Sequence, residues 1–414
     1  MKKALFSLIA LSLFMACTDE KKQSKNEYNL LQQTLTDSIN KMIDSLDFNG
    51  FGVAIVNDSG VLYQNGFGWA NVQTKEKYTG NTVQNIASIS KTFLGIALLK
   101  AQELGKLKLD DPINQYLPFQ VINPHHPNIP ITIRHLATHT STINDTKDYL
   151  NRAWILCDTI NLEQNLKIDI GECKFSAPAT EISMEHFLKN ILAKDEPWYH
   201  PDNFSKNKPG AIYAYSNLGA TLAALVIEKA TGKTYDNFTV EYILSPLQMK
   251  HSGWSLNSID KSKHTLLYID KTNAYPSYKC ITYPDGNMIT STADFSLYMS
   301  ELMKGYFGKG TLLNKESYAT YFAPQLSDYN FIDRKAGEFS DEYNMGITMG
   351  ISSTGNVGHT GGDPGLFSML FFNPTTKIGR YMIVNTDIND QKTWAQHKRI
   401  WDLLDSFGQQ MSKK

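Results

Sequence analysis

Apolar residues recur every three or four positions over residues 28–46, and this spacing predicts an amphipathic helix. Short runs rich in β-branched and aromatic residues lie near both ends of the chain, at 50–56, 61–69, 346–351, 365–372 and 379–384. The sequence Asn-Asp-Ser-Gly between the first two runs predicts a hairpin turn at 57–60. A second amphipathic pattern over 392–409 predicts a closing helix.

The middle of the chain follows the helical period instead. Predicted helices lie at 88–104, 132–139, 184–192, 216–231, 237–244 and 292–303. Residues 144–208 are polar and aromatic without sustained periodicity, which indicates an insertion. Strands at both ends imply that the two ends of the chain build one sheet together. The predicted fold is of the α/β (α+β) class, a mainly antiparallel sheet flanked by helices, with a mostly helical inserted subdomain at about 85–275.

The pattern of residues at the N-terminus predicts an export signal. Lys2 and Lys3 precede an apolar stretch that is too short to span a bilayer as a helix. The residues Phe-Met-Ala before Cys17 resemble a bacterial lipobox, in which the cysteine is diacylated and becomes the mature N-terminus. Simple cleavage near Ala16 is the alternative. We predict these segments: a signal peptide at 1–17, a tether at 18–26 and a folded domain at 27–414.

Lipidation of Cys17 would anchor the protein to a membrane of the bacterial cell envelope. The anchor would lie in the outer membrane or at the periplasmic face. The acidic pair Asp19-Glu20 after the cysteine also resembles the tether that routes some lipoproteins to the cell surface.

Composition narrows the classes of function. With 42% apolar and 20% charged residues, the chain has an ordinary globular composition. Forty basic and 41 acidic side chains give a net charge of −1. No basic run with interleaved aromatic residues occurs, so we expect no nucleic-acid partner.

Three cysteines remain after export. Cys157 and Cys173 enclose a short polar segment, and an oxidising compartment permits a disulfide between them. Buried free thiols are the alternative. The spacing of these residues and Cys280 fits no metal-site template, and we predict no metal.

Two histidines bear on the prediction that the protein binds no metal. His135 and His139 have the i, i+4 spacing of the zinc-protease helix, but Leu136 stands where that helix needs a glutamate. We therefore predict a structural helix here.

The pattern Ser-x-x-Lys occurs four times, so context must separate a candidate nucleophile from chance matches. After Ser88 and Lys91 comes a segment that is apolar nearly all round, which predicts a buried helix. The helix dipole and the free N–H groups of its first turn would favour negative charge at the Ser88 oxygen. Lys91 lies on the same face, and burial would lower its pKa so that it can act as a base.

A second motif, Tyr215-Ser216-Asn217, precedes another almost wholly apolar helix pattern. A phenol near a cation can give up its proton, and the amide of Asn217 can hydrogen-bond a substrate carbonyl. The alternative is a core tyrosine followed by a serine helix cap.

A third motif, His359-Thr360-Gly361-Gly362, lies between two strand patterns. A glycine-rich edge lets a substrate backbone approach closely, and its N–H groups can complete an oxyanion hole. The alternative is a plain turn between strands.

These motifs, in this order, resemble the serine β-lactamase and penicillin-binding-protein superfamily. The pattern is most similar to class C β-lactamases, D-Ala-D-Ala carboxypeptidases and β-lactamase-like esterases. The resemblance runs from about residue 47 to 387 and includes two longer phrases. They are Ile-Thr-Ile-Arg-His-Leu-Ala-Thr-His-Thr-Ser at 131–141 and Gly-His-Thr-Gly-Gly-Asp-Pro-Gly at 358–365.

The resemblance implies a role for each matching residue. Ser88 would be acylated, Lys91 would help to deprotonate it, and Tyr215 would be the general base and acid. The backbone N–H groups of Ser88 and Gly362 would form the oxyanion hole. The substrate-binding residues would be Asn217, His359, Thr360 and Gly361.

The expected function is that of a serine hydrolase that needs no metal or cofactor. Its small-molecule or peptide substrates would be β-lactams, D-amino-acid peptides or esters. Two residues depart from the family pattern. His359 replaces the lysine of the main β-lactamases and is mostly neutral at pH 7, which weakens the case for a dedicated penicillin-destroying enzyme. Thr142 stands where the family phrase continues with glycine, so we expect that turn to differ.

A protein of another class remains the alternative to an enzyme. It is a catalytically idle binding or scaffold protein of the cell envelope that has kept the fold. The presence of Ser88, Lys91 and Tyr215 together speaks against it.

Overall fold

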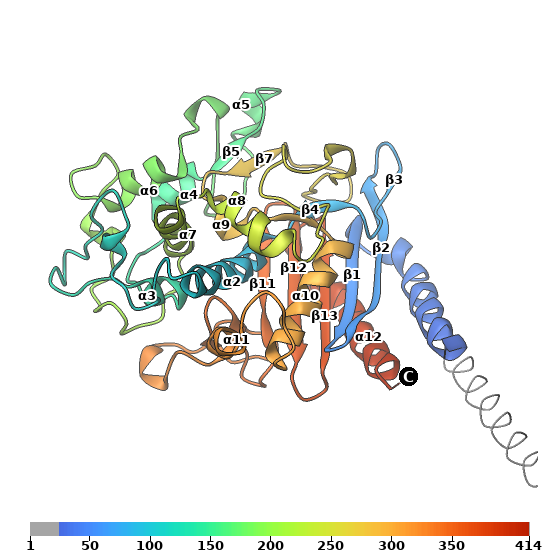
Figure 1. Cartoon of the computed structure of the whole chain (residues 1–414). Helices are drawn as coiled ribbons and strands as arrows, with labels where there is room; N and C mark the ends of the chain where they lie inside the picture. The colour runs from blue at the N-terminus through green and yellow to red at the C-terminus, as the bar shows by residue number, and fades with distance from the viewer. Residues whose placement is uncertain (1–24, 414) are drawn as a thin grey trace, which may run out of the picture.

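A computed structural model describes residues 25–413 (Figure 1). The predicted signal peptide and Cys17 lie outside these residues. A helix at 25–40 confirms the first predicted element, although it ends before the apolar pattern does. A turn and the 3-10 helix η1 (Ile43–Ser45) follow it. Within the described residues, no helix has both the length and the hydropathy of a membrane span.

The two ends of the chain share one eight-stranded antiparallel sheet, as the strand pattern predicts. β1 and β13 come from opposite ends of the sequence and lie side by side, with Val53 opposite Met382 (Figure 1). The predicted fold class is therefore confirmed. In spatial order the strands are β3 (Glu76–Lys77), β2 (Gly60–Asn71), β1 (Gly50–Asn57), β13 (Ile378–Val384), β12 (Leu366–Asn373), β11 (Val357–Asp363), β10 (Gly350–Ile351) and β9 (Asn344–Met345).

Both faces of this sheet are covered, because alternate side chains of each strand point to opposite faces. Val53 of β1 packs in one buried cluster with Ile400 of α12 (Gln391–Met411). Its neighbour Ala54 packs in the other cluster with Met299 of α10 (Thr292–Tyr306). Figure 1 shows α10 and α12 on opposite sides of the strands.

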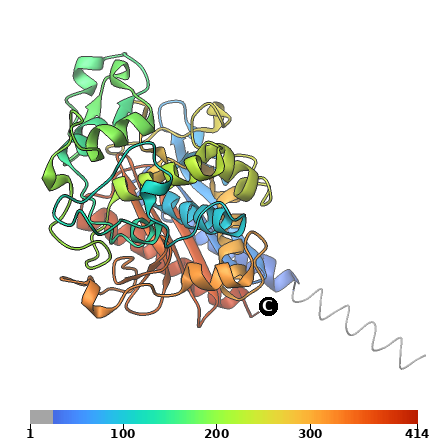
Figure 2. The ribbon, with the colours of Figure 1, turned by 60° about the vertical axis from the view of Figure 1, so that its left-hand side comes forward.

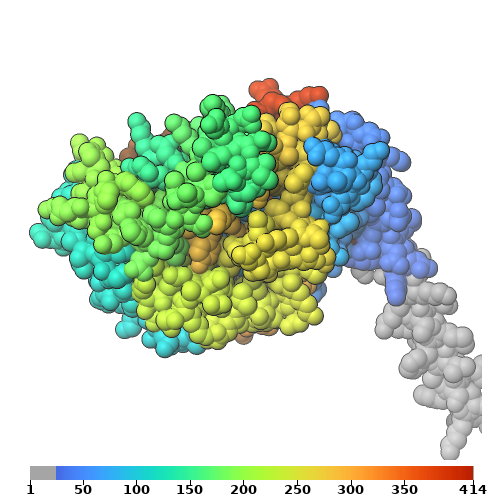
Figure 3. Space-filling view, turned by 90° about the horizontal axis from the view of Figure 1, so that it is seen from above, coloured from blue at the N-terminus to red at the C-terminus, as the bar shows by residue number. Residues whose placement is uncertain are grey.

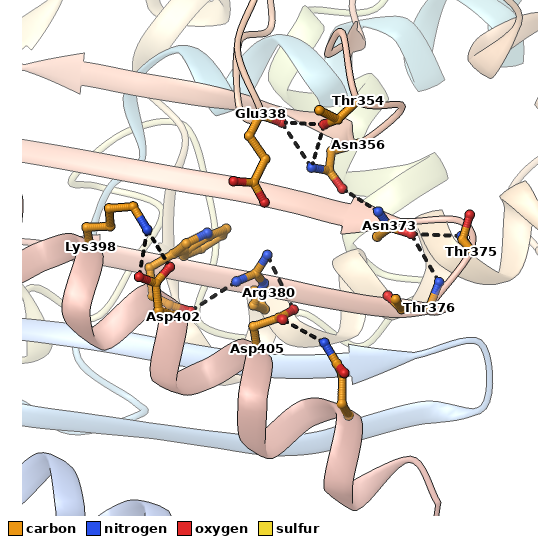
Figure 4. Close-up of polar contacts among 12 residues, drawn as sticks. Glu338, Thr354, Asn356, Asn373, Thr375, Thr376, Arg380, Lys398, Asp402 and Asp405 are labelled. Carbon is orange, nitrogen blue, oxygen red and sulfur yellow. Dashed lines mark hydrogen bonds and ion pairs between the residues drawn. The ribbon is translucent and has the colours of Figure 1, made fainter.

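Polar contacts fix α12 to the sheet (Figure 4). Arg380 of β13 donates to Trp401 O at 3.0 Å and forms an ion pair with Asp405 at 3.5 Å. At the turn between β12 and β13, Asn373 Oδ1 accepts hydrogen bonds from the N–H groups two and three residues later, at 2.9 and 3.0 Å. Figure 4 shows Arg380 facing α12 and the Asn373 contacts at the turn where the two strands end.

A helical region lies beside the sheet (Figures 1 and 2). Its two long helices, α2 (Ser90–Glu103) and α7 (Asn217–Thr231), pack against each other. Residues 90–99 of α2 are all buried, which confirms the buried helix predicted after Ser88. The shorter helices of this region include α3 (Ile133–Ala137), α8 (Tyr235–Thr239), α9 (Tyr283–Gly286) and α11 (Lys315–Phe322).

The segment predicted as an insertion, 144–208, forms short elements only. Its strand β5 (Trp154–Leu156) pairs in parallel with β6 (Phe175–Ser176) and antiparallel with β7 (Tyr278–Cys280). In Figure 3 the green residues of this segment face the yellow segment that precedes α10 across a hollow in the surface. Its other elements are α4 (Lys147–Arg152), α5 (Leu162–Asn165), η4 (Pro178–Thr180), α6 (Met184–Leu192) and η5 (Pro201–Asn203).

The predicted disulfide between Cys157 and Cys173 is wrong, since both residues are free cysteines. Trp154 lies opposite Phe175 in the parallel pair, so Cys157 follows the end of one strand while Cys173 precedes the start of the other. At about 3.3 Å per residue, this register separates them by more than the ~7 Å between Cα atoms that a disulfide allows.

Thr142 takes the left-handed backbone conformation that glycine adopts without strain, with a φ of 72°. Two hydrogen bonds hold it there. Its hydroxyl accepts from Asn123 Nδ2 at 2.9 Å, and its carbonyl accepts from Ser205 N at 2.7 Å. These contacts offset the conformational cost of a threonine at this position.

Candidate active site

Ser88 lies in a tight turn between a strand and a buried helix. β4 (Val83–Asn85) leads into the 3-10 helix η2 (Ala87–Ile89), and α2 follows directly. Ala87 has a φ of 49°, in the left-handed region that costs a non-glycine residue about 1–2 kcal/mol. This strained turn places Ser88 in the wall of a cavity of about 620 Å³.

Lys91 is fully buried beneath this serine. Its Nζ lies 2.9 Å from Ser88 Oγ and donates to Asp285 O at 2.6 Å. Burial lowers the pKa of Lys91, and the nearby carboxylates of Asp285 and Asp145 only partly oppose this. A neutral amine at this distance can accept the serine proton.

Tyr215 completes a trio around the serine oxygen. Lys91 Nζ lies 5.1 Å from the centre of its ring, and the Ser88 side chain is close enough to lower the pKa of the phenol. Burial raises the pKa of Tyr215 well above its usual value of 10. The phenol therefore carries its proton in the resting site and is suited to donate or relay it.

His139, predicted to be structural, lies against the tyrosine of this trio. Its ring centre is 4.4 Å from that of Tyr215, and its Nδ1 accepts a hydrogen bond from Ser216 N at 3.1 Å. Burial lowers the pKa of His139 well below 6.5, and the charge of Lys91 adds to this effect. The ring is thus a neutral support for Tyr215.

Asn217 is held by a carboxylate that sequence reasoning missed. Asp145 Oδ2 accepts from Asn217 Nδ2 at 2.8 Å and from Asn217 N at 3.0 Å. Its other oxygen accepts from Leu218 N at 3.0 Å, so Asp145 also satisfies the free N–H groups at the start of α7. An aspartate in an irregular segment carries no motif by which it could have been found.

The third motif forms the last residues of β11. His359 is 2% exposed, and its ring centre lies 6.2 Å from that of Tyr215. Burial lowers the pKa of His359, while Asp341 opposes the change. Thr360 donates to Asp341 Oδ2 from its N–H at 2.7 Å and from its hydroxyl at 2.8 Å. Asp341 was also missed by sequence reasoning.

Gly361 brings β11 against the serine turn. A Cβ at this position would lie 2.6 Å from Ile86 O and 3.1 Å from Ala87 Cβ, so only glycine allows this approach. A Cβ at Gly362 would meet no heavy atom within 4 Å, and Gly362 lines the cavity.

The N–H of Gly362 points away from β12. N–H groups of alternate strand residues share one edge, and the N–H of Thr360 donates outward to Asp341 rather than to β12. Gly362 therefore presents its N–H to the same outer edge, beside the Ser88 turn.

The cavity brings together only part of the predicted site. Ser88, Asn217 and Gly362 line it, whereas the other predicted site residues do not: Lys91, Tyr215, His359, Thr360 and Gly361. Its remaining lining comes from α4, β5, the 169–173 segment, Tyr275, α9, the turn from β11 into β12 and the loop after β13. The predicted insertion therefore forms one wall of the cleft.

Comparison with known sequences identifies this arrangement. The Beta-lactamase family profile matches residues 35–404. The chain belongs to the beta-lactamase family. This membership supports a function of the serine-hydrolase type and leaves the substrate open.

Two relatives in this family illustrate how far the sequence of this chain has diverged. Protein flp of Staphylococcus aureus (strain MW2) is 27% identical over 250 residues, which cover 59% of this chain and 43% of that protein. The chain therefore spans less than half the length of this relative. Penicillin-binding protein 4* of Bacillus subtilis (strain 168) is 25% identical over 369 residues, covering 84% of this chain and 69% of that protein.

Solved structures of the family share the fold. The beta-lactamase/D-alanine carboxypeptidase from Yersinia pestis matches with a TM-score of 0.66 at 18% identity, over 93% of this chain and 99% of that one. The octameric penicillin-binding protein homologue from Pyrococcus abyssi matches with a TM-score of 0.62 at 21% identity, over 89% and 77%. At these identities the likeness establishes the fold alone.

The cleft of this family member is acidic. The lining includes Asp169, Asp285, Asp363 and Asp387, and among the described residues that line it none is lysine, arginine or histidine. Burial raises the pKa of Asp285 to about 6 and that of Asp363 to about 8. In each case a second aspartate adds to the shift and Lys91 opposes it.

Within residues 25–413, no three His, Cys, Asp or Glu side chains gather in a way that could hold a metal ion. His135, the partner of His139 in the zinc-helix spacing, caps α3 because its Nδ1 accepts from Thr132 N at 3.2 Å.

Proposed function

We propose that this beta-lactamase-family protein is a serine hydrolase that forms an acyl-enzyme on Ser88. The observation that carries the proposal is the fully buried Lys91, whose Nζ lies 2.9 Å from Ser88 Oγ. A lysine buried only for stability would be costly, since an amine loses its hydration there. Its contact with the Ser88 oxygen in the cleft wall explains the burial, because a buried amine at this oxygen can act as a catalytic base.

In the acylation step, Ser88 Oγ attacks the carbonyl carbon of the substrate while its proton passes to Lys91 Nζ. The carbonyl oxygen takes the negative charge and is stabilised by the N–H groups of Ser88 and Gly362. The proton then reaches the leaving nitrogen or oxygen through the Tyr215 hydroxyl, and the bond to the leaving group breaks.

In the deacylation step, water attacks the ester carbon of the acyl-enzyme. Its proton passes through Tyr215 and Lys91 to Ser88 Oγ, the acid product leaves, and the enzyme is restored. This scheme assigns the role of resting base to Lys91 instead of Tyr215, because burial raises the pKa of Tyr215 and lowers that of Lys91.

Asn217 orients the substrate in this scheme. Asp145 accepts from Asn217 Nδ2 at 2.8 Å, which fixes the amide so that its oxygen faces away from the carboxylate. The amide is thereby oriented before the substrate binds, as precise positioning requires.

Covalent labelling tests the proposal. A fluorophosphonate probe reacts with an activated serine and should label the wild-type protein, with the adduct on the peptide that contains Ser88. The Ser88→Ala variant should not be labelled, while its melting temperature stays within a few degrees. A wild-type protein that resists the probe under conditions that label a control hydrolase would point to the idle scaffold protein instead.

We further propose that Cys17 anchors the enzyme to the bacterial envelope, on the strength of the lipobox-like sequence alone. The Cys17→Ala variant should move from the membrane fraction to the soluble fraction on cell fractionation. Continued sedimentation of this variant with the membranes would refute the lipid anchor.

A further inference from the structure

A carboxylate of the protein occupies the outer edge of β11. Asp341 Oδ2 receives the N–H and the hydroxyl of Thr360, at 2.7 and 2.8 Å. His359 Nδ1 lies 3.2 Å from the same oxygen, but its hydrogen bond is with the carbonyl oxygen of Thr360, at 2.6 Å. The two Thr360 donors that converge on one oxygen form an anion-binding site, and here the anion is part of the chain.

Packing fixes Asp341 in this position. Its backbone lies directly on Gly350 of β10, where a Cβ would come within 2.7 Å of Asp341 Cα and 2.8 Å of Asp341 O. The side chain is only 14% exposed. The carboxylate is therefore part of the resting site and not a mobile surface group.

A substrate carboxylate at this edge would meet two obstacles. The donors of Thr360 are already paired, and the charge of Asp341 would repel a second anion that is poorly screened by water. The adjoining cavity adds four lining aspartates and, among the described residues that line it, no cationic side chain. The site thus lacks the positive charge that would recruit an anion.

We propose that Asp341 is a specificity-determining residue that fills the anion-binding outer edge of β11, beside the cleft. The enzyme then hydrolyses esters or amides that are neutral or cationic beside the scissile bond and rejects those with a carboxylate there. Penicillins and peptides that end in D-alanine carry such a carboxylate and fall in the rejected class. The inference rests on the proposed serine-hydrolase function of Ser88.

Two probes of Ser88 separate this inference from the proposed function. A neutral fluorophosphonate reports whether the serine is reactive, and a fluorescent penicillin reports whether a carboxylate-bearing acyl donor is accepted. The wild-type protein should react with the first and only slowly with the second. In Asp341→Ala, the labelling rate with penicillin relative to fluorophosphonate should rise at least about tenfold, as expected when a charged contact is freed.

Inhibition of penicillin labelling by acetate distinguishes a vacated anion site from a general change in structure. It should fill the vacated donors of Asp341→Ala and slow penicillin labelling of this variant, but leave the wild-type protein unaffected at the same ionic strength. Asp333→Ala is the matched control, because Asp333 is an exposed aspartate of the same loop and its loss should not alter the ratio. If Asp341→Ala does not fold, Asp341→Asn keeps the shape and removes the charge, with a smaller gain expected.

The outcomes are distinct. Fluorophosphonate labelling with equally fast penicillin labelling of the wild-type protein would overturn the role of Asp341. An unchanged ratio in folded Asp341 variants would overturn it too. Absence of fluorophosphonate labelling would refute the serine-hydrolase function itself.

Discussion

The two sides of the candidate site are built in different ways. At the start of α2, Ser88 and Lys91 lie three residues apart on one buried helix, and burial lowers the pKa of the amine. At the end of β11, His359 and Thr360 depend on Asp341, which comes from a separate loop and packs on β10. In the proposed mechanism, the nucleophile and its base thus come from local sequence, while substrate selection is set by a distant segment that can change without disturbing them.

The largest expected effect is on the local side. Lys91→Met removes the proposed base and should lower kcat/KM by about 1,000-fold for every substrate alike, within the range of general-base catalysis. Steady-state kinetics with a neutral and a charged substrate measures this. A loss confined to one substrate would show that Lys91 acts in substrate selection. It would contradict the division of roles between the two sides of the site.

The matched control for this variant is Lys100→Met, on the last turn of the same helix. Lys100 pairs with Glu103 at 3.0 Å near the surface. This replacement should leave kcat/KM within about twofold, since a partly exposed ion pair near the surface contributes about 1 kcal/mol to stability and nothing to chemistry.

Gly361 is the point where the two sides touch. In Gly361→Ala the added methyl would meet Ile86 O at 2.6 Å and Ser368 Oγ at 2.5 Å, and would push β11 away from the serine turn. We expect a loss of about 1–3 kcal/mol in the free energy of unfolding and a reduced labelling rate at Ser88. Urea unfolding measures the first effect. Gly362→Ala is the control, because its methyl meets open space. Equal destabilisation by the two replacements would contradict the close approach described for Gly361.

The contrast between local and distant residues also explains which parts of the site the sequence could predict. Ser88 stood out because the segment after it is apolar nearly all round, which is a local signal of burial. Asp145 and Asp341 gave no such signal, since a lone aspartate in an irregular segment is usually a solvated residue. Their roles arise only when the fold brings them to Asn217 and Thr360.

Strand boundaries and pairings show the same limit. Residues 346–351 were predicted as one strand, yet only Gly350–Ile351 forms a strand there. Thr348 has a φ of 55° and donates its N–H to Ala137 O, so the chain bends to contact the helical region. Likewise, the distance from Cys157 to Cys173 depends on the register of β5 and β6, which no periodicity reveals.

The smallest expected effect concerns Asp363, which follows Gly362 on β11 and lies within reach of the charges of Asp285 and Lys91. Burial raises its pKa to about 8 in the folded protein, against about 3.9 in the unfolded chain. Between these values the folded state binds the extra proton, so wild-type stability falls as the pH rises through this window. Asp363→Asn removes that dependence. The stability of the variant relative to the wild-type protein should therefore be unchanged near pH 4 and should grow by about 1–2 kcal/mol by pH 8, after allowance for partial exposure. Thermal unfolding across this range measures the difference. A constant difference at every pH would mean that Asp363 is ionised throughout, and that the acidic cleft is charged even before a substrate enters it.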